Sequence, residues 1–297
     1  MAKNLKAVCF GEILYDVFPD MERIGGAPLN VASRLASMGV ETEMISKVGN
    51  DERGNLLLEY LQNHKIKTDN IEKDEQHPTG MVKVNLSEGG SATYEITHPV
   101  AWDKIEVSEG MIKSVQQSDA FIFGSLVCRD EVSRKALFTL IPKAKYRVLD
   151  FNLRPPHYTA DLLLELMQHA EFIKFNDDEL FEIADMMGSK YNSLEQNLLF
   201  MAVKTKAKTI CVTKGSHGAV LMHHKKMYYN SGYKIKVKDT VGAGDSFLGT
   251  LLAKLLQEVE PQTALDHACA VGALVAGQEG ANPEISAETI KSFIDPY

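Results

Sequence analysis

The sequence is poor in cysteine and carries no excess of positive charge. No two of its four cysteines have the spacing of a metal or redox pair, and three lie in apolar runs, which favours small buried core residues. The formal net charge is −8 at pH 7. Because nucleic acids and anionic membrane surfaces bind basic patches, we expect neither as a partner. The cysteines are Cys9, Cys128, Cys211 and Cys269.

Long hydrophobic runs and a leader segment are also missing. No apolar run has the length that a membrane span needs. The first residues lead almost directly into a strand-like run at 7–10, which leaves no room for a signal peptide. With 44% hydrophobic and 24% charged residues, the composition is that of a globular protein. We therefore expect a cytoplasmic protein, and its 297 residues suffice for one large α/β domain or two ordinary ones.

Short apolar runs alternate with longer helical patterns over most of the chain. The runs are apolar on both faces, which is typical of strands covered by helices on each side. We predict an α/β fold in a single domain over residues 1–297, with a doubly wound, mainly parallel sheet flanked by helices. Strands are expected at 7–10, 43–48, 120–123, 147–151, 172–175 and 209–213, with a later hairpin at 219–223 and 226–229. Helices are expected at 29–38 (ended by Gly39), 54–63, 161–169, 178–187, 194–205, 246–257 and 263–278.

Residues 79–97 break this rhythm and have the pattern of a hairpin around the turn Glu88-Gly89-Gly90-Ser91. With a third strand near residues 13–18, they could form a small sheet that covers the active site as a lid, with elements at about 12–24 and 79–103. An antiparallel extension of the main sheet is the alternative. The hairpin has apolar residues on both of its faces, which is more apolar surface than covering one active site requires. These residues are Met81, Val82, Val84, Leu86, Tyr94 and Ile96.

Flexible backbone and a carboxylate come together at residues 239–247, at the start of an apolar helix. Gly242 and Gly244 let the backbone approach a ligand closely. The unpaired N–H groups of a first helical turn form an anion site. In that setting Asp245 is unusual unless it handles a proton, and at the positive helix end it should stay ionised. In isolation the segment fits a helix N-cap equally well.

The glycines of this segment do not belong to the common nucleotide motifs. The chain has no Walker A sequence, and no G-x-G-x-x-G follows its first strand. A helix N-terminus with a carboxylate beside the anion suits a phosphoryl-transfer kinase, in which the carboxylate orients and finally deprotonates the attacking hydroxyl.

Polar groups elsewhere could complete such a site. A second glycine pair, Gly25-Gly26, opens a helix that contains Asn30, whose amide can donate and accept hydrogen bonds. Asp16 follows the first strand and could bind sugar hydroxyls. Arg154 lies at the end of another strand and suits an anionic oxygen. Taken alone, the glycine pair and Asp16 are more often structural.

Two further features follow later strands. Asn176 and Glu179 leave a strand three residues apart, and they could hold Mg²⁺ through water or form a helix capping box. The turn from Thr213 to Gly218 could take nucleotide phosphates or be a plain hairpin turn.

Together these motifs resemble the ribokinase-like (PfkB) family of sugar kinases, in family order and over essentially the whole chain. Within it the chain is most similar to the bacterial fructokinases, through the Gly-Gly-Ala-Pro form of the first motif, Asn152-Leu153-Arg154-Pro155 and Pro99-Val100-Ala101-Trp102-Asp103. The motifs are Gly25-Gly26-Ala27-Pro28-Leu29-Asn30-Val31-Ala32, Val48-Gly49-x-Asp51-x-x-Gly54, Asp150-x-Asn152-x-Arg154, Asn176-x-x-Glu179, Thr213-Lys214-Gly215-x-x-Gly218 and Asp239-Thr240-x-Gly242-Ala243-Gly244-Asp245.

The resemblance implies a ribokinase-like fold and ATP- and Mg²⁺-dependent phosphorylation of a sugar hydroxyl, with fructose as the expected sugar. Asp245 would be the base, and the N–H groups of Gly242, Ala243 and Gly244 the anion hole. The remaining implied roles are sugar binding by Asp16, Gly25, Gly26, Asn30 and Arg154, organisation of Mg²⁺ and phosphates by Asn176 and Glu179, and nucleotide binding by Thr213, Gly215 and Gly218.

The family also implies a K⁺ ion beside the anion hole, at Asp239 and the carbonyl of Val241, with further carbonyls near residues 275–280. Its lids often pair two copies, so we expect a homodimer through the lid. Two alternatives stay open: a kinase of another small substrate (2-keto-3-deoxygluconate, ribose or a nucleoside), and a sugar-binding protein that has lost catalysis.

Overall fold

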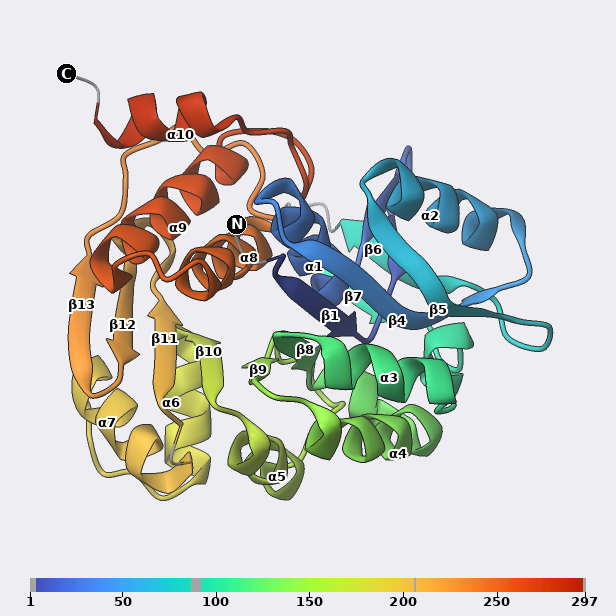
Figure 1. The fold of residues 1–297 in the computed structure, drawn as a ribbon, viewed down its shortest axis with the longest axis horizontal. Coiled ribbons are helices and arrows are strands. Elements are labelled where there is room, and N and C mark those ends of the chain that lie inside the picture. The colour runs from blue at the N-terminus through green and yellow to red at the C-terminus, as the bar shows by residue number, and fades with distance from the viewer. Residues whose placement is uncertain (1–3, 87–91, 206, 296–297) are drawn as a thin grey trace.

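One large sheet organises the molecule (Figure 1). The computed structural model describes residues 4–86, 92–205 and 207–295. In the large sheet the strands follow the order β13-β12-β11-β10-β9-β8-β1-β4-β5. Their bounds are β1 Lys6–Phe10, β4 Glu41–Gly49, β5 Ile66–Asp74, β8 Ala120–Gly124, β9 Arg147–Asp150, β10 Phe172–Asn176, β11 Thr209–Thr213, β12 Ala219–His223 and β13 Lys226–Asn230.

The strands from β5 to β11 run parallel, and β12 and β13 add an antiparallel edge. The central strands are buried on both faces, and all five residues of β8 are inaccessible. This burial explains the unbroken apolar runs in the sequence. The prediction of a doubly wound, mainly parallel sheet is confirmed.

Helices cover both faces of this sheet (Figure 1). One face of the sheet packs against α1 and α8, and the other against α4 and α5. The first layer is α1 Ala27–Ser37, α2 Glu52–Asn63, α8 Ala243–Leu256 and α9 Pro261–Ala276, with α10 Ala287–Ile294 packed on α9. The second is α3 Glu109–Gln117, α4 Glu131–Leu140, α5 Ala160–His169, α6 Asp177–Met186 and α7 Leu194–Thr205. Short 3₁₀ turns lie at Ala101–Lys104, Leu126–Arg129, Ile141–Lys143 and Gly215–His217.

The predicted strands and helices are all present, with ends shifted by up to three residues. Helix α1 begins at Ala27 because Gly26 is its N-cap and Pro28 fits the first turn. Gly39, with a φ of 82°, follows its end as predicted. The sequence analysis missed α3, α4, α10 and the strands β3 and β5.

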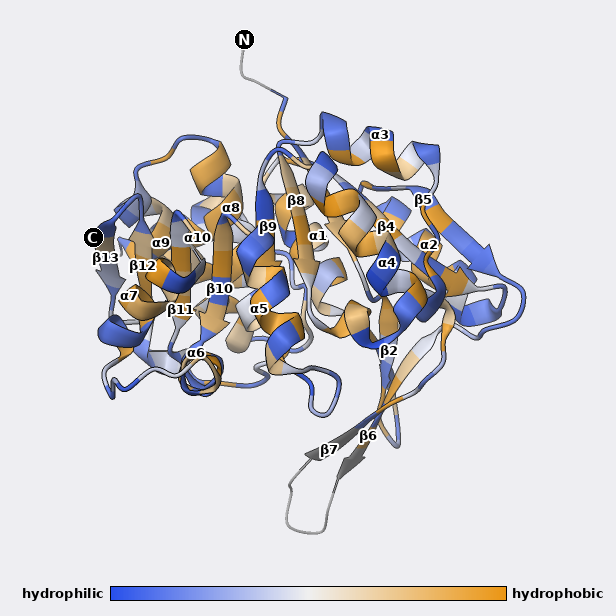
Figure 2. Cartoon of the chain, turned by 90° about the horizontal axis from the view of Figure 1, so that it is seen from below, coloured by the Kyte–Doolittle hydropathy of each residue, from blue (hydrophilic) through white to orange (hydrophobic). Residues whose placement is uncertain are grey.

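A second, four-stranded sheet has the order β3-β2-β6-β7. It leaves the main sheet at the carboxyl end of β1, and its β6–β7 hairpin projects from the body (Figure 2). Its existence excludes the alternative of an extension of the main sheet. The predicted turn at residues 88–91 and the side chains of Leu86 and Tyr94 lie outside the described residues. The bounds are β2 Leu14–Val17, β3 Glu22–Gly25, β6 Gly80–Leu86 and β7 Ala92–Ile96.

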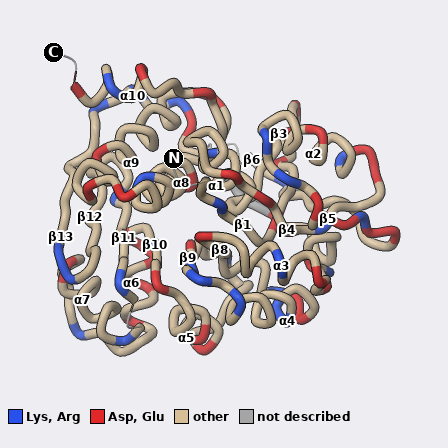
Figure 3. Tube along the Cα trace, viewed as in Figure 1, with Lys and Arg blue, Asp and Glu red and all other residues tan. Residues whose placement is uncertain are grey.

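All four cysteines are buried and unbonded, in agreement with a packing role. Basic and acidic residues are interspersed over the molecule rather than separated by sign (Figure 3). Within the described part of the chain, no helix is long and apolar enough to cross a membrane.

Candidate active site

The candidate site lies where the strand order reverses. Strand β1 pairs with β4 on one side and with β8 on the other, so the connections that follow these strands diverge. Such a switch point leaves a crevice at the carboxyl ends of the strands. Asp150 ends β9 and Asn176 ends β10 at this edge. The predicted catalytic segment reaches the same edge from α8.

Helix α8 begins at Ala243, after Gly242 in a left-handed conformation with a φ of 74°. A Cβ on Gly242 would lie 2.5 Å from the Cβ of Ala281, so close packing also requires glycine here. The N–H of Ala243 donates to the carbonyl of Thr240 at 3.2 Å. Of the three residues predicted for the anion hole, Ala243 therefore already has an internal partner for its N–H.

Asp245 lies in the first turn of α8 and is 8% exposed. The amide of Asn30 donates to its Oδ2 at 2.8 Å, and that of Asn152 lies 3.5 Å from its Oδ1. Burial raises the pKa of Asp245, while Lys174, Asn30 and Arg154 act in the opposite direction. The structure thus joins residues of three predicted motifs around one buried carboxylate.

Lys174 and Asp150 form a buried ion pair behind Asp245, with the ammonium 2.9 Å from Oδ1 of Asp150. Asn152 donates to Oδ2 of Asp150 at 2.9 Å, which connects this pair to Asp245. A Cβ on Gly244 would lie 3.5 Å from Nζ of Lys174. The ammonium group therefore lies directly under the first turn of α8.

The Gly25-Gly26 pair is required by close packing. Gly26 has a φ of 111°, and a Cβ there would lie 2.5 Å from the carbonyl oxygen of Glu12. A Cβ on Gly25 would lie 2.5 Å from Oδ2 of Asp16. Burial raises the pKa of Asp16 to about 6, against the attraction of Arg154. The pair thus places Asp16 and helix α1, which carries Asn30, at one edge of the crevice.

Asp239 is held by three donors. Nη1 of Arg23, from β3, lies 2.6 Å from its Oδ2, which also accepts the N–H of Gly280 at 3.2 Å. The N–H of Val241 donates to its Oδ1 at 3.0 Å. At the predicted monovalent-cation position, the aspartate therefore has a guanidinium partner. Among the described residues, no group of three or more His, Cys, Asp or Glu side chains could hold a metal ion.

Asn176 and Glu179 form the capping box that was the structural alternative for this motif. Both Glu179 oxygens are engaged: Oε2 accepts the N–H of Asn176 at 2.8 Å, and Oε1 accepts that of Leu153 at 2.9 Å. These bonds tie the end of β10 to the segment that carries Asn152 and Arg154.

The predicted nucleotide turn lies beside this box. Thr213 ends β11 opposite Asn176, so the two residues are neighbours in the sheet. Gly215 and Gly218 have φ angles of 52° and 76°. A Cβ on Gly218 would overlap the carbonyl of Asn230. This turn packs against the end of β13, and the structure does not bring it into contact with Asp245.

Arg154 is exposed, and among the described residues its Nη1 donates to the carbonyl of Leu153, at 3.0 Å. It still lowers the pKa values of Asp16 and Asp245. Arg154 therefore lies at the mouth of the site with its guanidinium largely available to a ligand.

The family model described as pfkB family carbohydrate kinase matches residues 5–288. The chain belongs to this family.

Relatives and solved structures in the family cover most of the chain. A sugar kinase of Pyrococcus horikoshii described as uncharacterized, PH1459, is 31% identical over 240 residues, which are 78% of this chain and 73% of that protein. Its structure in complex with ATP covers 94% of both chains, with a TM-score of 0.80 and 26% identity. Fructokinase-2 of Zea mays is 28% identical over 95% of this chain and 91% of its own. A fructokinase double mutant from Vibrio cholerae, in fructose, ADP and potassium ion bound form, has a TM-score of 0.85 at 23% identity, and covers 99% of this chain and 100% of that chain.

The protein is thus a sugar kinase, a phosphotransferase with a sugar hydroxyl as acceptor. The sequence analysis missed two groups at its candidate site. Glu12 follows β1 and is 4% exposed, and its Oε2 has no hydrogen-bond partner in the part of the chain that the structure describes. Burial raises its pKa to about 7. Asn282, between α9 and α10, donates to Oδ1 of Asn30 at 2.8 Å. A polar residue after a strand was a usable signal for Glu12, whereas Asn282 has no local signal.

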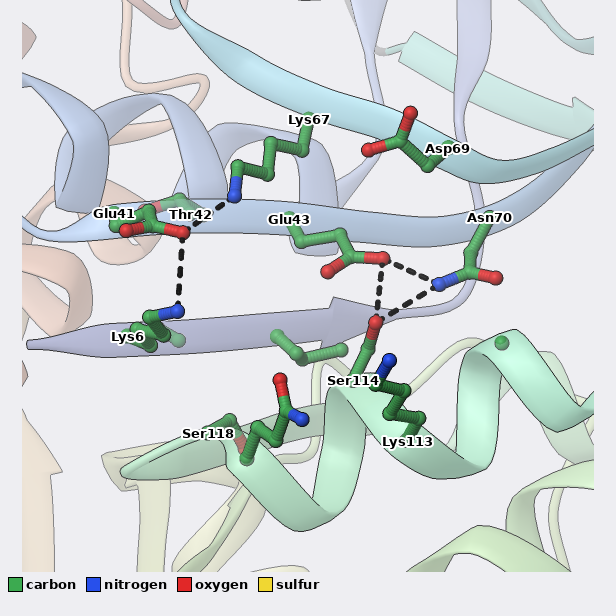
Figure 4. A pocket seen from close by; sticks show the side chains of 14 residues that line it. Lys6, Glu41, Thr42, Glu43, Lys67, Asp69, Asn70, Lys113, Ser114 and Ser118 are labelled. Carbon is green, nitrogen blue, oxygen red and sulfur yellow. Dashed lines mark hydrogen bonds and ion pairs between the residues drawn. The ribbon is translucent and has the colours of Figure 1, made fainter.

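A hollow in the described part of the kinase lies elsewhere. It has a volume of about 360 Å³ and lies at the amino ends of β1, β4 and β5, against α3 (Figure 4). Its polar groups largely satisfy one another. Lys67 and Lys6 reach Glu41 at 2.5 and 3.6 Å, and Glu43 accepts from Asn70 and Ser114. The hollow is at the edge of the sheet opposite Asp245.

Proposed function

We propose that this sugar kinase transfers the γ-phosphoryl group of ATP to a hydroxyl group of fructose. The observation that carries the proposal is the buried Asp245 in the first turn of α8, held by Asn30 and Asn152. The similarity to a maize and a Vibrio cholerae fructokinase, the latter with fructose bound, supports the choice of sugar.

In the proposed reaction the sugar hydroxyl oxygen attacks the γ-phosphorus. Its bond to phosphorus forms while the bond to the β,γ-bridging oxygen breaks, and ADP leaves. The hydroxyl proton passes to Asp245, late in a loose transition state. Negative charge on the transferred group would face the N–H groups of Gly242, Ala243 and Gly244 at the positive end of α8, for which the N–H of Ala243 would leave Thr240.

The sugar would lie between the two sheets. Asp16 can accept hydrogen bonds from sugar hydroxyls, and Gly25 and Gly26 leave the backbone open to a ligand at that edge. Asn30 contacts Asp245 directly, so a hydroxyl bound by Asn30 would lie next to the base. Arg154, exposed at the mouth, can reach an anionic oxygen of sugar or phosphate.

The nucleotide would lie across the ends of β10 and β11, where Asn176, Glu179 and Thr213 meet and where Gly215 and Gly218 form the turn. Because both Glu179 oxygens already accept backbone N–H groups, the capping box suits Mg²⁺ held through water molecules. When bound, Mg²⁺ would neutralise charge on the phosphates. A K⁺ ion at Asp239 and Val241 would have to displace or share the Arg23 guanidinium.

We also propose a single kinase domain with the small sheet as its lid, and a homodimer formed through that lid. Two observations support the assignment of the small sheet as a lid: it carries Asp16, and it lies at the carboxyl end of β1. Val82 and Val84 are buried within one copy, at 7% and 3% exposure, and Ile96 pairs with Val82 and packs against the core of the same copy. Met81 is partly exposed and could contact a partner. Light scattering at micromolar concentration tests the dimer, and a monomer mass would rule it out.

A coupled assay of ADP release over a panel of sugars tests the proposed function. The panel contains fructose, glucose, ribose, 2-keto-3-deoxygluconate and a nucleoside, each with ATP and Mg²⁺. We expect the highest kcat/KM with fructose. If another compound has a kcat/KM about a hundredfold higher than fructose, that compound is the substrate instead of fructose. Sugar binding in calorimetry without ADP release under any cation would favour a sugar-binding protein that has lost catalysis.

A further inference from the structure

Three side chains from distant parts of the sequence form one hydrogen-bonded chain at the base. Nδ2 of Asn282 donates to Oδ1 of Asn30 at 2.8 Å, and Nδ2 of Asn30 donates to Oδ2 of Asp245 at 2.8 Å. In both bonds the donor is the residue farther from Asp245 along this series. Asn282 is separated from Asp245 by Asn30, so it acts on the base only through that amide.

The direction of this chain depends on the ionisation of Asp245. An ionised carboxylate only accepts hydrogen bonds, whereas a carboxamide has one donor end and one acceptor end. An ionised Asp245 therefore requires Nδ2 of Asn30, which leaves Oδ1 of Asn30 for a donor. Asn282 supplies that donor. The reverse chain needs a protonated Asp245 and both amides turned around.

The loop that carries Asn282 is tied to α1 and, through Arg34, to α8. Its neighbour Pro283 accepts a hydrogen bond from the buried Arg34 at 3.1 Å, and Arg34 also reaches the Ser246 hydroxyl at 3.3 Å. The side chain of Tyr60, from α2, lies near Asn282. Oδ1 of Asn282 is buried without a partner among the described residues. Turning the amide would set this carbonyl against that of Asn30.

We propose that Asn282 is a positioning residue that keeps the nitrogen of the Asn30 amide turned toward Asp245. This inference rests on the proposed role of Asp245 as the base. With Asn282 in place, a proton on Asp245 finds no acceptor at Asn30, so the chain favours the ionised carboxylate that a base needs. Without it, Asn30 can turn and accept a hydrogen bond from protonated Asp245.

A substitution at position 282 leaves the other charged groups around these three side chains in place. The positive groups facing Asp245 are Lys174 and Arg154, and Glu12, Asp16 and Asp150 are the carboxylates near it. Arg34 and Tyr60 face the loop that carries Asn282.

Two substitutions separate orientation from packing. Asn282→Leu keeps the branched shape and the number of heavy atoms and removes the donor. Asn282→Asp provides only an acceptor, so it should draw Nδ2 of Asn30 away from Asp245. We expect the acidic limb of the kcat/KM profile to move to higher pH in both variants, by about one pH unit in Asn282→Asp and by less in Asn282→Leu. The exposed Asn192→Asp is the matched control and should leave the limb in place.

Asn282→Asp could act on Asp245 by turning the Asn30 amide or by its added charge. Measuring the same substitution in an Asn30→Ala background separates these two effects. A direct effect of charge would persist without Asn30, whereas an effect through the amide should largely disappear. The double-mutant cycle should therefore show strong coupling between positions 30 and 282.

A ¹³C NMR titration of labelled aspartate carboxyls gives a readout independent of turnover, with the Asp245 signal assigned by its loss in Asp245→Asn. We expect its pKa to rise in both Asn282 variants. An unchanged pKa in both overturns the positioning role. If the pKa rises while the wild-type rate shows no acidic limb, Asn282 positions Asn30 as proposed and the base role of Asp245 fails instead.

Discussion

Arg23 and Asp239, 216 positions apart in the chain, form an ion pair in which Nη1 and Oδ2 are 2.6 Å apart. The pair links β3 of the small sheet to the loop that precedes α8. Because the same carboxylate is the proposed K⁺ ligand, the guanidinium and the ion compete for it.

The first prediction concerns this competition. Arg23→Gln frees the Asp239 carboxylate, so K⁺ should activate the variant at lower concentration, by about threefold or more, than the wild type. Activity measured against KCl concentration, at ionic strength kept constant with choline chloride, checks this. Arg53→Gln removes another arginine that pairs with the same strand, at Glu22, and should leave the K⁺ response unchanged. Equal K⁺ responses of wild type and Arg23→Gln would contradict the assignment of Asp239.

The second prediction concerns Glu12 and stability. Its pKa is raised from 4.5 to about 7 by burial, so the folded state binds this proton more tightly than the unfolded state. The resulting stability is present below pH 4.5 and is lost as the pH rises to about 7. Glu12→Gln should therefore be more stable than the wild type at pH 8, by up to about 3 kcal/mol, with the advantage shrinking toward pH 5.

Urea unfolding at pH 5, 6, 7 and 8 measures this difference. The same substitution at the exposed Glu106 should change the stability equally at all four pH values. A Glu12→Gln advantage that does not vary with pH would show that Glu12 ionises normally in the folded protein.

The third prediction uses two glycines that share a left-handed backbone. Gly188 has a φ of 82° and open space around it, whereas a Cβ on Gly242 would lie 2.5 Å from that of Ala281. Gly188→Ala should lower the free energy of unfolding by about 1 kcal/mol and leave turnover unchanged. Gly242→Ala should destabilise more, and it should lower kcat by at least about a hundredfold because the anion hole shifts. Similar kcat values for the two variants would remove Gly242 from the phosphoryl site.

The sequence predicted what periodicity and ordered motifs determine. Apolar runs identified the central strands, and β5 was missed because its sequence, Ile-Lys-Thr-Asp-Asn-Ile-Glu-Lys-Asp, is that of a polar edge strand. The motif order assigned Asn30 and Asp245 to one site, and the two side chains are in hydrogen-bond contact although 215 positions separate them.

The rest depends on tertiary packing that leaves no local pattern. Nothing near Asn282 indicates that it reaches Asn30, and a single arginine in a short strand does not reveal Asp239 as its partner. The burial that raises the pKa of Glu12 arises from α1, β8 and β9 closing around it. These contacts join elements whose relative positions only the fold defines.

The base role of Asp245 is most directly tested by the turnover of Asp245→Asn, measured together with ATP binding by calorimetry. Asparagine keeps the shape and can still accept from Asn30, but it cannot take the hydroxyl proton. We predict that kcat falls by about a thousandfold or more while the Kd for ATP stays within about threefold of the wild type. A variant that retains kcat within about tenfold of the wild type would contradict the assignment of Asp245 as the base.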